Sequence, residues 1–262
     1  MAHHAAGTQL QQMSGGFDPT LSDVSLGTTI VAVSYDGGVI LGADSRTSTG
    51  SYVANRAQDK ITPLTDRVYL CRSGSASDTQ AIAAHVQHYL SAMQAERAGA
   101  GPGSGGGGPG GAPSVRAAAT LCMQMAYGNK NALQAGLIVA GYDRGAAGGG
   151  GSVYAIPLGG TLLKVPYAIG GSGSAYITGF CDRRYREGMG EAEARAFVVA
   201  ALGHAIARDA SSGGCVRTVT VDAKGARRDF VPGDRVPVAF GELAAAARRR
   251  GPPPAAATAE AR

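Results

Sequence analysis

Three polar residues in the first quarter of the chain, Thr28, Asp44 and Lys60, are of the types that a threonine nucleophile requires. A threonine hydroxyl is a weak nucleophile at neutral pH, and a free α-amine, whose ordinary pKa is near ~8, can serve as its base. A lysine ammonium nearby would lower the pKa of both the hydroxyl and the amine, and a carboxylate could hold that lysine in place. This chemistry needs Thr28 as a free N-terminus, so residues 1–27 would have to be removed.

The pattern of residues 29–43 predicts a β-hairpin that brings Thr28 and Asp44 together. Residues 29–35 are β-branched and strand-like, the Asp-Gly-Gly sequence that follows is a turn signal, and residues 39–43 run back. In an antiparallel hairpin, the end of the second strand lies beside the beginning of the first. Residues 1–27 carry no periodic pattern, so the pattern changes abruptly where the candidate nucleophile stands.

The rest of the chain predicts blocks of strands separated by pairs of helices. Strands are expected at 60–64, 68–71, 136–142, 153–157, 162–167, 216–221 and 226–231, and helices at 75–96, 114–129, after 170–173 and at 191–208. Because strands and helices do not alternate, a doubly wound sheet is disfavoured. The order indicates an α+β fold in which two packed sheets are each covered by a helix pair.

Several motifs occur together in an order and spacing typical of one family. They are TTIVAV from Thr28, GADSR from Gly42, Lys60, CRSGSASD from Cys71, GGSGS from Gly170 and RDASSGG from Arg208. Over residues 27–240 the chain resembles a proteasome catalytic beta subunit, and it is most similar to the caspase-like (post-acidic) type. The resemblance implies a four-layer αββα sandwich of the N-terminal nucleophile hydrolase type, in agreement with the predicted element order.

The resemblance also implies how the site would work. Thr28 would be the nucleophile, its freed α-amine the base, and Gly27 the residue before the self-cleavage point. Asp44 and Lys60 would tune the nucleophile, and the backbone N–H of Gly74 would form the oxyanion hole, where the loss of one donor typically costs ~3 kcal/mol. Three further residues match the polar shell of the family around the terminal amine: Ser172, Asp209 and Ser212.

Substrate contacts are implied for Arg72, Thr47 and Thr49. Arg72 lies two residues before Gly74, where the family places the floor of the pocket for the residue before the cut bond. A buried arginine there would favour Glu or Asp and disfavour Lys or Arg, because truncating a buried charge pair costs roughly 2–5 kcal/mol. Polypeptides cut after acidic residues are therefore the expected substrates.

Composition argues against several other classes of function. The formal charge is +5, but the basic residues are scattered, so nucleic-acid binding is disfavoured. No run of about 18 apolar residues is present, so no membrane span is expected. The four cysteines lack metal-ligand spacing and are interpreted as free thiols, and no metal or cofactor is expected.

The N-terminal residues lack the basic character of a secretory or transit signal. An intracellular protein is therefore expected, and the resemblance implies the cytoplasm and nucleus.

Three segments follow from this interpretation: a pro-segment at 1–27, a beta-subunit domain at 28–240 and a disordered tail at 241–262. Gly-rich stretches at 98–113 and 145–151 are expected to be loop insertions. The resemblance implies assembly with other alpha and beta subunits in four stacked seven-membered rings. Two alternatives stay open: a non-catalytic structural beta subunit, and an amidase of the same hydrolase class that acts on small molecules.

Overall fold

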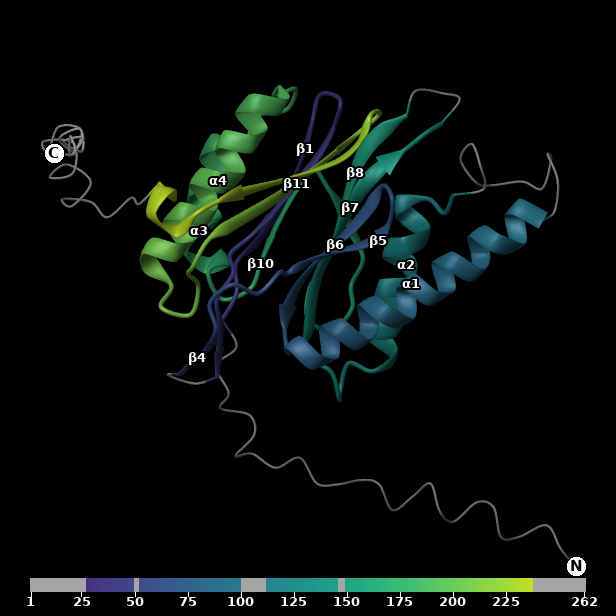
Figure 1. The fold of residues 1–262 in the computed structure, drawn as a ribbon, viewed down its shortest axis with the longest axis horizontal. Coiled ribbons are helices and arrows are strands. Elements are labelled where there is room, and N and C mark those ends of the chain that lie inside the picture. Colours follow the sequence, from purple (N-terminus) through teal and green to yellow (C-terminus); the bar gives the residue numbers. More distant parts are fainter. Residues whose placement is uncertain (1–26, 50–51, 100–111, 146–148, 238–262) are drawn as a thin grey trace, which may run out of the picture.

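The structure is a computed structural model that describes residues 27–49, 52–99, 112–145 and 149–237. Two antiparallel five-stranded sheets pack face to face within this part of the chain, and a pair of helices covers the outer face of each. The helices are α1 (Ala76–Gly99), α2 (Val115–Gly128), α3 (Ser174–Arg184) and α4 (Glu191–Arg208). Figure 1 shows α1 and α2 on one side of the sheets and α3 and α4 on the other. The α+β class and the four-layer αββα arrangement predicted from the sequence are confirmed.

The first sheet contains the hairpin that follows the candidate nucleophile. Its strand order is β10-β1-β2-β11-β12. The bounds are β1 (Ile30–Tyr35), β2 (Gly38–Ala43), β10 (Tyr167–Gly170), β11 (Val216–Asp222) and β12 (Gly225–Val231). The register pairs Ile30 with Ala43, as the predicted hairpin requires. Gly37 turns the chain with φ of +118°, a conformation that glycine adopts without steric penalty.

The second sheet has the strand order β5-β6-β7-β8-β9. The bounds are β5 (Ile61–Thr65), β6 (Val68–Gly74), β7 (Ala135–Asp143), β8 (Gly150–Ile156) and β9 (Leu163–Val165). The prediction of a single strand at 162–167 was wrong, because this stretch divides between the two sheets. β9 pairs with β8 up to Val165, and β10 then pairs with β1 from Tyr167. Pro166 lies at the crossing, where its missing N–H suits the end of a strand, and its carbonyl accepts hydrogen bonds from Ser34.

The apolar core follows the four layers. One cluster fills the space between the α1–α2 pair and the second sheet, one lies between the sheets, and one lies between the α3–α4 pair and the first sheet. Because both faces of each sheet are covered, central strands read as continuous apolar runs rather than as alternating ones. β2 is buried at all six positions for this reason.

The ends of the helices follow local rules that the sequence already carries. The Ser75 hydroxyl accepts a hydrogen bond from the backbone N–H of Asp78 at 3.4 Å, and the Ser114 hydroxyl accepts one from Ala117 at 3.2 Å. Serine at these positions satisfies an N–H that has no partner within the helix. None of the described helices is both long enough and apolar enough to cross a membrane.

A two-stranded pair, β3 (Thr47–Thr49) and β4 (Tyr52–Asn55), projects from the sandwich and was not predicted. A bulge interrupts its register between Thr47 and Ser48. The predicted pro-segment, apart from Gly27, lies outside the described residues, and so does the predicted tail at 241–262. Most of the Gly-rich stretch at 98–113 also lies outside them. The assignment of domain boundaries therefore stays a prediction.

Candidate active site

The hairpin and the strand that follows it bring Thr28, Asp44 and Lys60 together. Thr28 precedes β1, Asp44 follows β2, and Lys60 precedes β5. The ladder of the hairpin continues one step beyond the strands, since the Asp44 N–H donates to the Thr29 carbonyl at 3.1 Å. The Thr29 N–H in turn donates to Asp44 Oδ1 at 2.9 Å. The backbone of the hairpin thus places the carboxylate beside the candidate nucleophile.

The Lys60 ammonium lies at the centre of this cluster. Its Nζ donates to Asp44 Oδ1 at 2.7 Å and to Thr28 Oγ1 at 3.0 Å. Lys60 is 5% exposed and Asp44 is fully buried, so the ion pair is shielded from water. Burial lowers the pKa of Lys60 below its ordinary value, while the attraction of Asp44 acts in the opposite direction. A positive charge in contact with Thr28 Oγ1 favours the alkoxide form of that hydroxyl.

The peptide bond between Gly27 and Thr28 lies inside the same cluster. Thr28 Oγ1 donates to the Gly27 carbonyl oxygen at 2.5 Å, and Lys60 Nζ lies 3.3 Å from that oxygen. The Gly27 backbone is closely packed, because a Cβ added there would lie 2.0 Å from the Ser211 Cβ and 2.2 Å from the Ser211 carbonyl oxygen. Only glycine therefore fits beside Ser211 at this position. The close packing holds the Gly27 carbonyl against the Thr28 hydroxyl.

Asp44 is held by the backbone as well as by Lys60. Its Oδ2 accepts hydrogen bonds from the N–H of Gly213 at 3.0 Å and from the N–H of Arg46 at 3.2 Å. Each donor stabilises the charged form of the carboxylate and fixes its orientation. The Arg46 carbonyl also accepts from Lys60 Nζ at 2.5 Å. Four donors on the carboxylate therefore fix its orientation toward the lysine.

A second polar cluster surrounds the backbone nitrogen of Thr28. This nitrogen donates to Ser172 Oγ at 3.1 Å, and Ser172 Oγ donates to Asp209 Oδ2 at 2.7 Å. The Ser212 hydroxyl donates to the same carboxylate oxygen at 2.6 Å and lies 2.7 Å from the Thr29 hydroxyl. Ser172 comes from the turn before α3, whereas Asp209 and Ser212 follow α4. These three residues, predicted as a polar shell, are thus brought together at the nitrogen of Thr28.

A small cavity of about 30 Å³ opens beside Thr28 and is bordered by Arg72 and Gly74. Arg72 is 7% exposed, and its guanidinium donates to the Thr62 hydroxyl at 2.9 Å and to the Asp59 carbonyl at 2.8 Å. No carboxylate pairs with it among the described residues. Burial lowers the pKa of Arg72, and the charge of Asp59 partly offsets this effect. The cavity therefore presents a buried cation that lacks a counter-ion.

Gly74 stands at the end of β6 with φ of +100°. A Cβ at this position would lie 2.2 Å from the Gln134 carbonyl oxygen, so both the conformation and the space require glycine. Gly74 also borders a second, larger cavity of about 720 Å³ between the two sheets. Residues of β6, β7, β8, β9 and β10 contribute to its lining, and Ser172 lines it as well. The sequence did not predict it, because its walls come from strands distant in the chain.

The predicted substrate contacts are only partly brought together. Thr47 lines the small cavity with Arg72, and its neighbour Ser48 lines it as well. Thr49 is exposed on β3 and does not line it. Its predicted role in substrate binding stays a prediction.

Sequence reasoning assigned no role to Arg46, although this residue belongs to one of the motifs that it identified. The Arg46 guanidinium donates to the Ala210 carbonyl at 2.7 Å and packs over Gly213, where a Cβ would lie 2.4 Å from its Cζ. Arg46 thereby ties the loop after α4 to the hairpin. Its place immediately after Asp44 was the signal that could have indicated this contact.

Comparison with known proteins shows which proteins this sequence is similar to. The sequence matches the family model described as "Proteasome subunit" over residues 24–102 and 108–221. It is 50% identical to "Proteasome subunit beta type-6" of Arabidopsis thaliana over 84% of this chain and 88% of the relative. It is 48% identical to "Proteasome subunit beta type-1" of Saccharomyces cerevisiae over 79% of this chain and 88% of that protein. It is also 43% identical to "Proteasome subunit beta type-9" of Salmo salar over 84% of this chain and 94% of that protein.

Proposed function

The chain belongs to the proteasome beta subunit family, and we propose that it is a catalytic member, a threonine endopeptidase that cuts polypeptides after acidic residues. The observation that carries this proposal is the contact of Lys60 Nζ with Thr28 Oγ1 at 3.0 Å and with the buried Asp44 carboxylate at 2.7 Å. A structural subunit would have no need for a buried ammonium directed at a threonine hydroxyl, because burying a charge is unfavourable in itself.

Self-cleavage is the first step that this geometry supports. The Thr28 hydroxyl oxygen attacks the Gly27 carbonyl carbon, and the carbon–nitrogen bond breaks as an ester forms between Gly27 and the Thr28 side chain. The hydroxyl proton passes to the departing nitrogen, which becomes the free α-amine. Water then hydrolyses the ester, leaving a carboxylate on Gly27 and restoring the hydroxyl. Lys60 supports this step because its ammonium faces both the hydroxyl and the Gly27 carbonyl oxygen.

Peptide hydrolysis then uses the same hydroxyl on a substrate carbonyl. The freed α-amine takes the hydroxyl proton and gives it to the leaving amine of the substrate, and water releases the acyl group. The Ser172–Asp209 pair supports this role, because it already contacts the Thr28 nitrogen and would hold the amine in place. The N–H of Gly74 is the proposed oxyanion donor, and a donor of this kind is worth about 3 kcal/mol in the transition state.

The buried Arg72 supports post-acidic specificity. Its guanidinium borders the cavity beside Thr28 and has no carboxylate partner among the described residues. A Glu or Asp side chain of the substrate would supply the missing counter-ion, whereas a Lys or Arg side chain would add a second buried cation.

The family also supports proposals about assembly and location. The protein would assemble with other proteasome subunits, and we propose the ring positions of a core particle made of four stacked seven-membered rings. Residues 1–27 would be the pro-segment lost on self-cleavage. Cytoplasm and nucleus are the proposed locations, and imaging of the tagged chain tests them.

The test compares Thr28→Ala with Thr28→Ser in the assembled particle, using peptides that carry Glu, Tyr or Arg before the cut bond. Thr28→Ala removes the nucleophile, so hydrolysis of the Glu peptide should vanish while assembly is retained. Thr28→Ser keeps a hydroxyl and should keep measurable activity. Undiminished cleavage of the Glu peptide by Thr28→Ala would identify this chain as a structural subunit.

A further inference from the structure

Among the described residues, Asp59 is the acidic residue whose charge acts on the pKa of the buried Arg72 guanidinium. The backbone carbonyl of Asp59 accepts a hydrogen bond from Arg72 Nη2 at 2.8 Å, yet its carboxylate does not pair with Arg72. An acidic side chain so close to the pocket would neutralise the arginine and repel an acidic substrate. Something must therefore hold this carboxylate away from the pocket.

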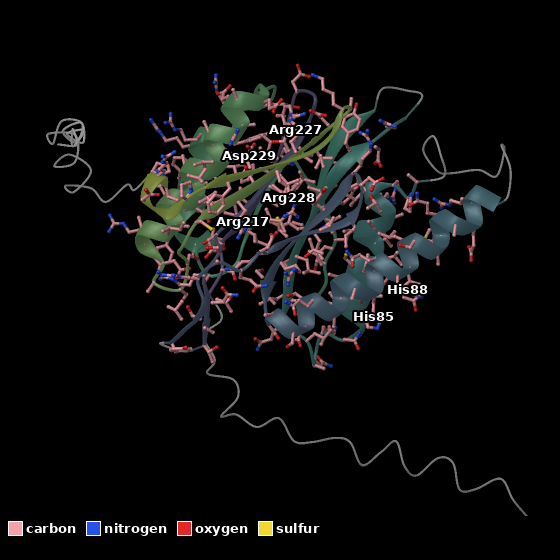
Figure 2. All side chains as sticks on the ribbon, in the orientation of Figure 1. His85, His88, Arg217, Arg227, Arg228 and Asp229 are labelled. Atoms are coloured by element: carbon pink, nitrogen blue, oxygen red, sulfur yellow. The ribbon has the colours of Figure 1, made fainter. Side chains whose placement is uncertain are left out.

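The residue that holds it is Arg228 on β12. Arg228 Nη1 pairs with Asp59 Oδ2 at 2.6 Å, and Arg228 Nη2 donates to the Ile61 carbonyl at 2.7 Å. The other carboxylate oxygen of Asp59 accepts from the Ile61 N–H at 3.0 Å. Both carboxylate oxygens are thus occupied by groups other than Arg72. Figure 2 labels Arg228, which belongs to β12 of the first sheet, and its hydrogen bond to Ile61 reaches β5 of the second sheet.

We propose that Arg228 is a specificity-determining positioning residue: it neutralises and orients the Asp59 carboxylate so that the Arg72 cation stays available to an acidic side chain of the substrate. This inference rests on the proposed post-acidic activity and assigns part of that specificity to a strand outside the pocket. Arg228 does not line the cavity beside Thr28, so the proposed effect on the Arg72 cation passes through Asp59.

A merely structural role for Arg228 predicts a different result. Arg228 joins the edges of the two sheets, so its loss could loosen the segment that carries Lys60, and every substrate would then be cut more slowly. The electrostatic role instead predicts a selective loss. Cleavage after Glu would weaken, mainly through a higher KM, while cleavage after Leu would be unchanged.

The experiment measures kcat and KM of the assembled particle on two peptides that differ only in Glu or Leu before the cut bond. For Arg228→Gln, the ratio of kcat/KM for Glu over Leu should fall about fivefold, the size expected for one partly exposed charge. The matched control is Arg227→Gln, which removes the same charge one position earlier. Arg227 pairs with Asp222 and Glu191 rather than with Asp59, so its ratio should match the wild type.

The decisive variant combines Arg228→Gln with Asp59→Asn. Asparagine keeps an acceptor for the Ile61 N–H but removes the negative charge, so the double variant should regain the Glu preference of the wild type. A ratio that stays low in the double variant, or an equal loss for both peptides in Arg228→Gln, would overturn the proposal. If the wild-type particle containing this chain does not cut after Glu in a Thr28-dependent way, the proposed function itself fails, which is a distinguishable result.

Discussion

The replacement Asp44→Asn tests how much of the proposed chemistry depends on the buried ion pair. The carboxylate is fully buried and accepts four hydrogen bonds, from Lys60 Nζ and from the N–H groups of Thr29, Gly213 and Arg46. An asparagine amide has one acceptor oxygen, so its NH₂ group must face a donor on one side. The Lys60 ammonium would also lose its counter-ion, and breaking a buried ion pair costs about 3–5 kcal/mol.

Removal of Asp44 also removes the attraction that raises the pKa of Lys60, so burial would lower that pKa further. A smaller fraction of Lys60 would carry charge at neutral pH, and Thr28 Oγ1 would lose its stabilising cation. If the transition state loses about 3 kcal/mol of electrostatic stabilisation, kcat for post-acidic hydrolysis falls by about 100-fold.

The assay separates the effect on self-cleavage from the effect on hydrolysis. Asp44→Asn is compared in the full chain and in a chain whose Thr28 is exposed by an added, separately cleavable leader. Asp36→Asn, an exposed aspartate at the far end of the same hairpin, is the matched control and should behave as wild type. A kcat for Asp44→Asn within about threefold of wild type, in the chain with Thr28 exposed, would refute the reasoning.

Three further outcomes are expected. Arg72→Leu should reverse the preference between Glu and Leu peptides, with a loss of about 30-fold or more in kcat/KM for the Glu peptide. An unchanged ratio of kcat/KM for Glu over Leu would show that Arg72 does not contact the substrate. Gly27→Ala should slow self-cleavage at least about tenfold, because its Cβ would lie 2.0 Å from the Ser211 Cβ, and the fraction of unprocessed chain measures this. Leu202→Ala, in the core between α4 and the first sheet, should lower the free energy of unfolding by about 2–5 kcal/mol in urea titrations of the purified chain.

Local patterns were sufficient to predict much of the fold. The β1–β2 hairpin and the position of Asp44 beside Thr28 follow from strand-forming residues and one turn, and both appear in the structure. The prediction of α4 at 191–208 agrees with its observed bounds, since its apolar stripe and its acidic first turn are local features. The division at Pro166 was missed, because the apolar pattern on the two sides of this residue is continuous and only tertiary packing assigns each half to its sheet.

Contacts between distant segments divide into two groups. The meeting of Ser172 with Asp209 was anticipated only through the resemblance to a family, because no local rule connects residues so far apart in the chain. The pairing of Asp59 with Arg228 was not anticipated at all. Both residues belong to ordinary polar segments, and their contact depends on how the edge of one sheet lies against the edge of the other.

The most direct measurement is the intact mass of this chain isolated from active particles. The proposed chemistry requires the amino group of Thr28 to be free, so the mature chain should begin at Thr28. An active particle in which this chain still carries Gly27, with post-acidic hydrolysis that depends on the chain, would contradict the proposed mechanism.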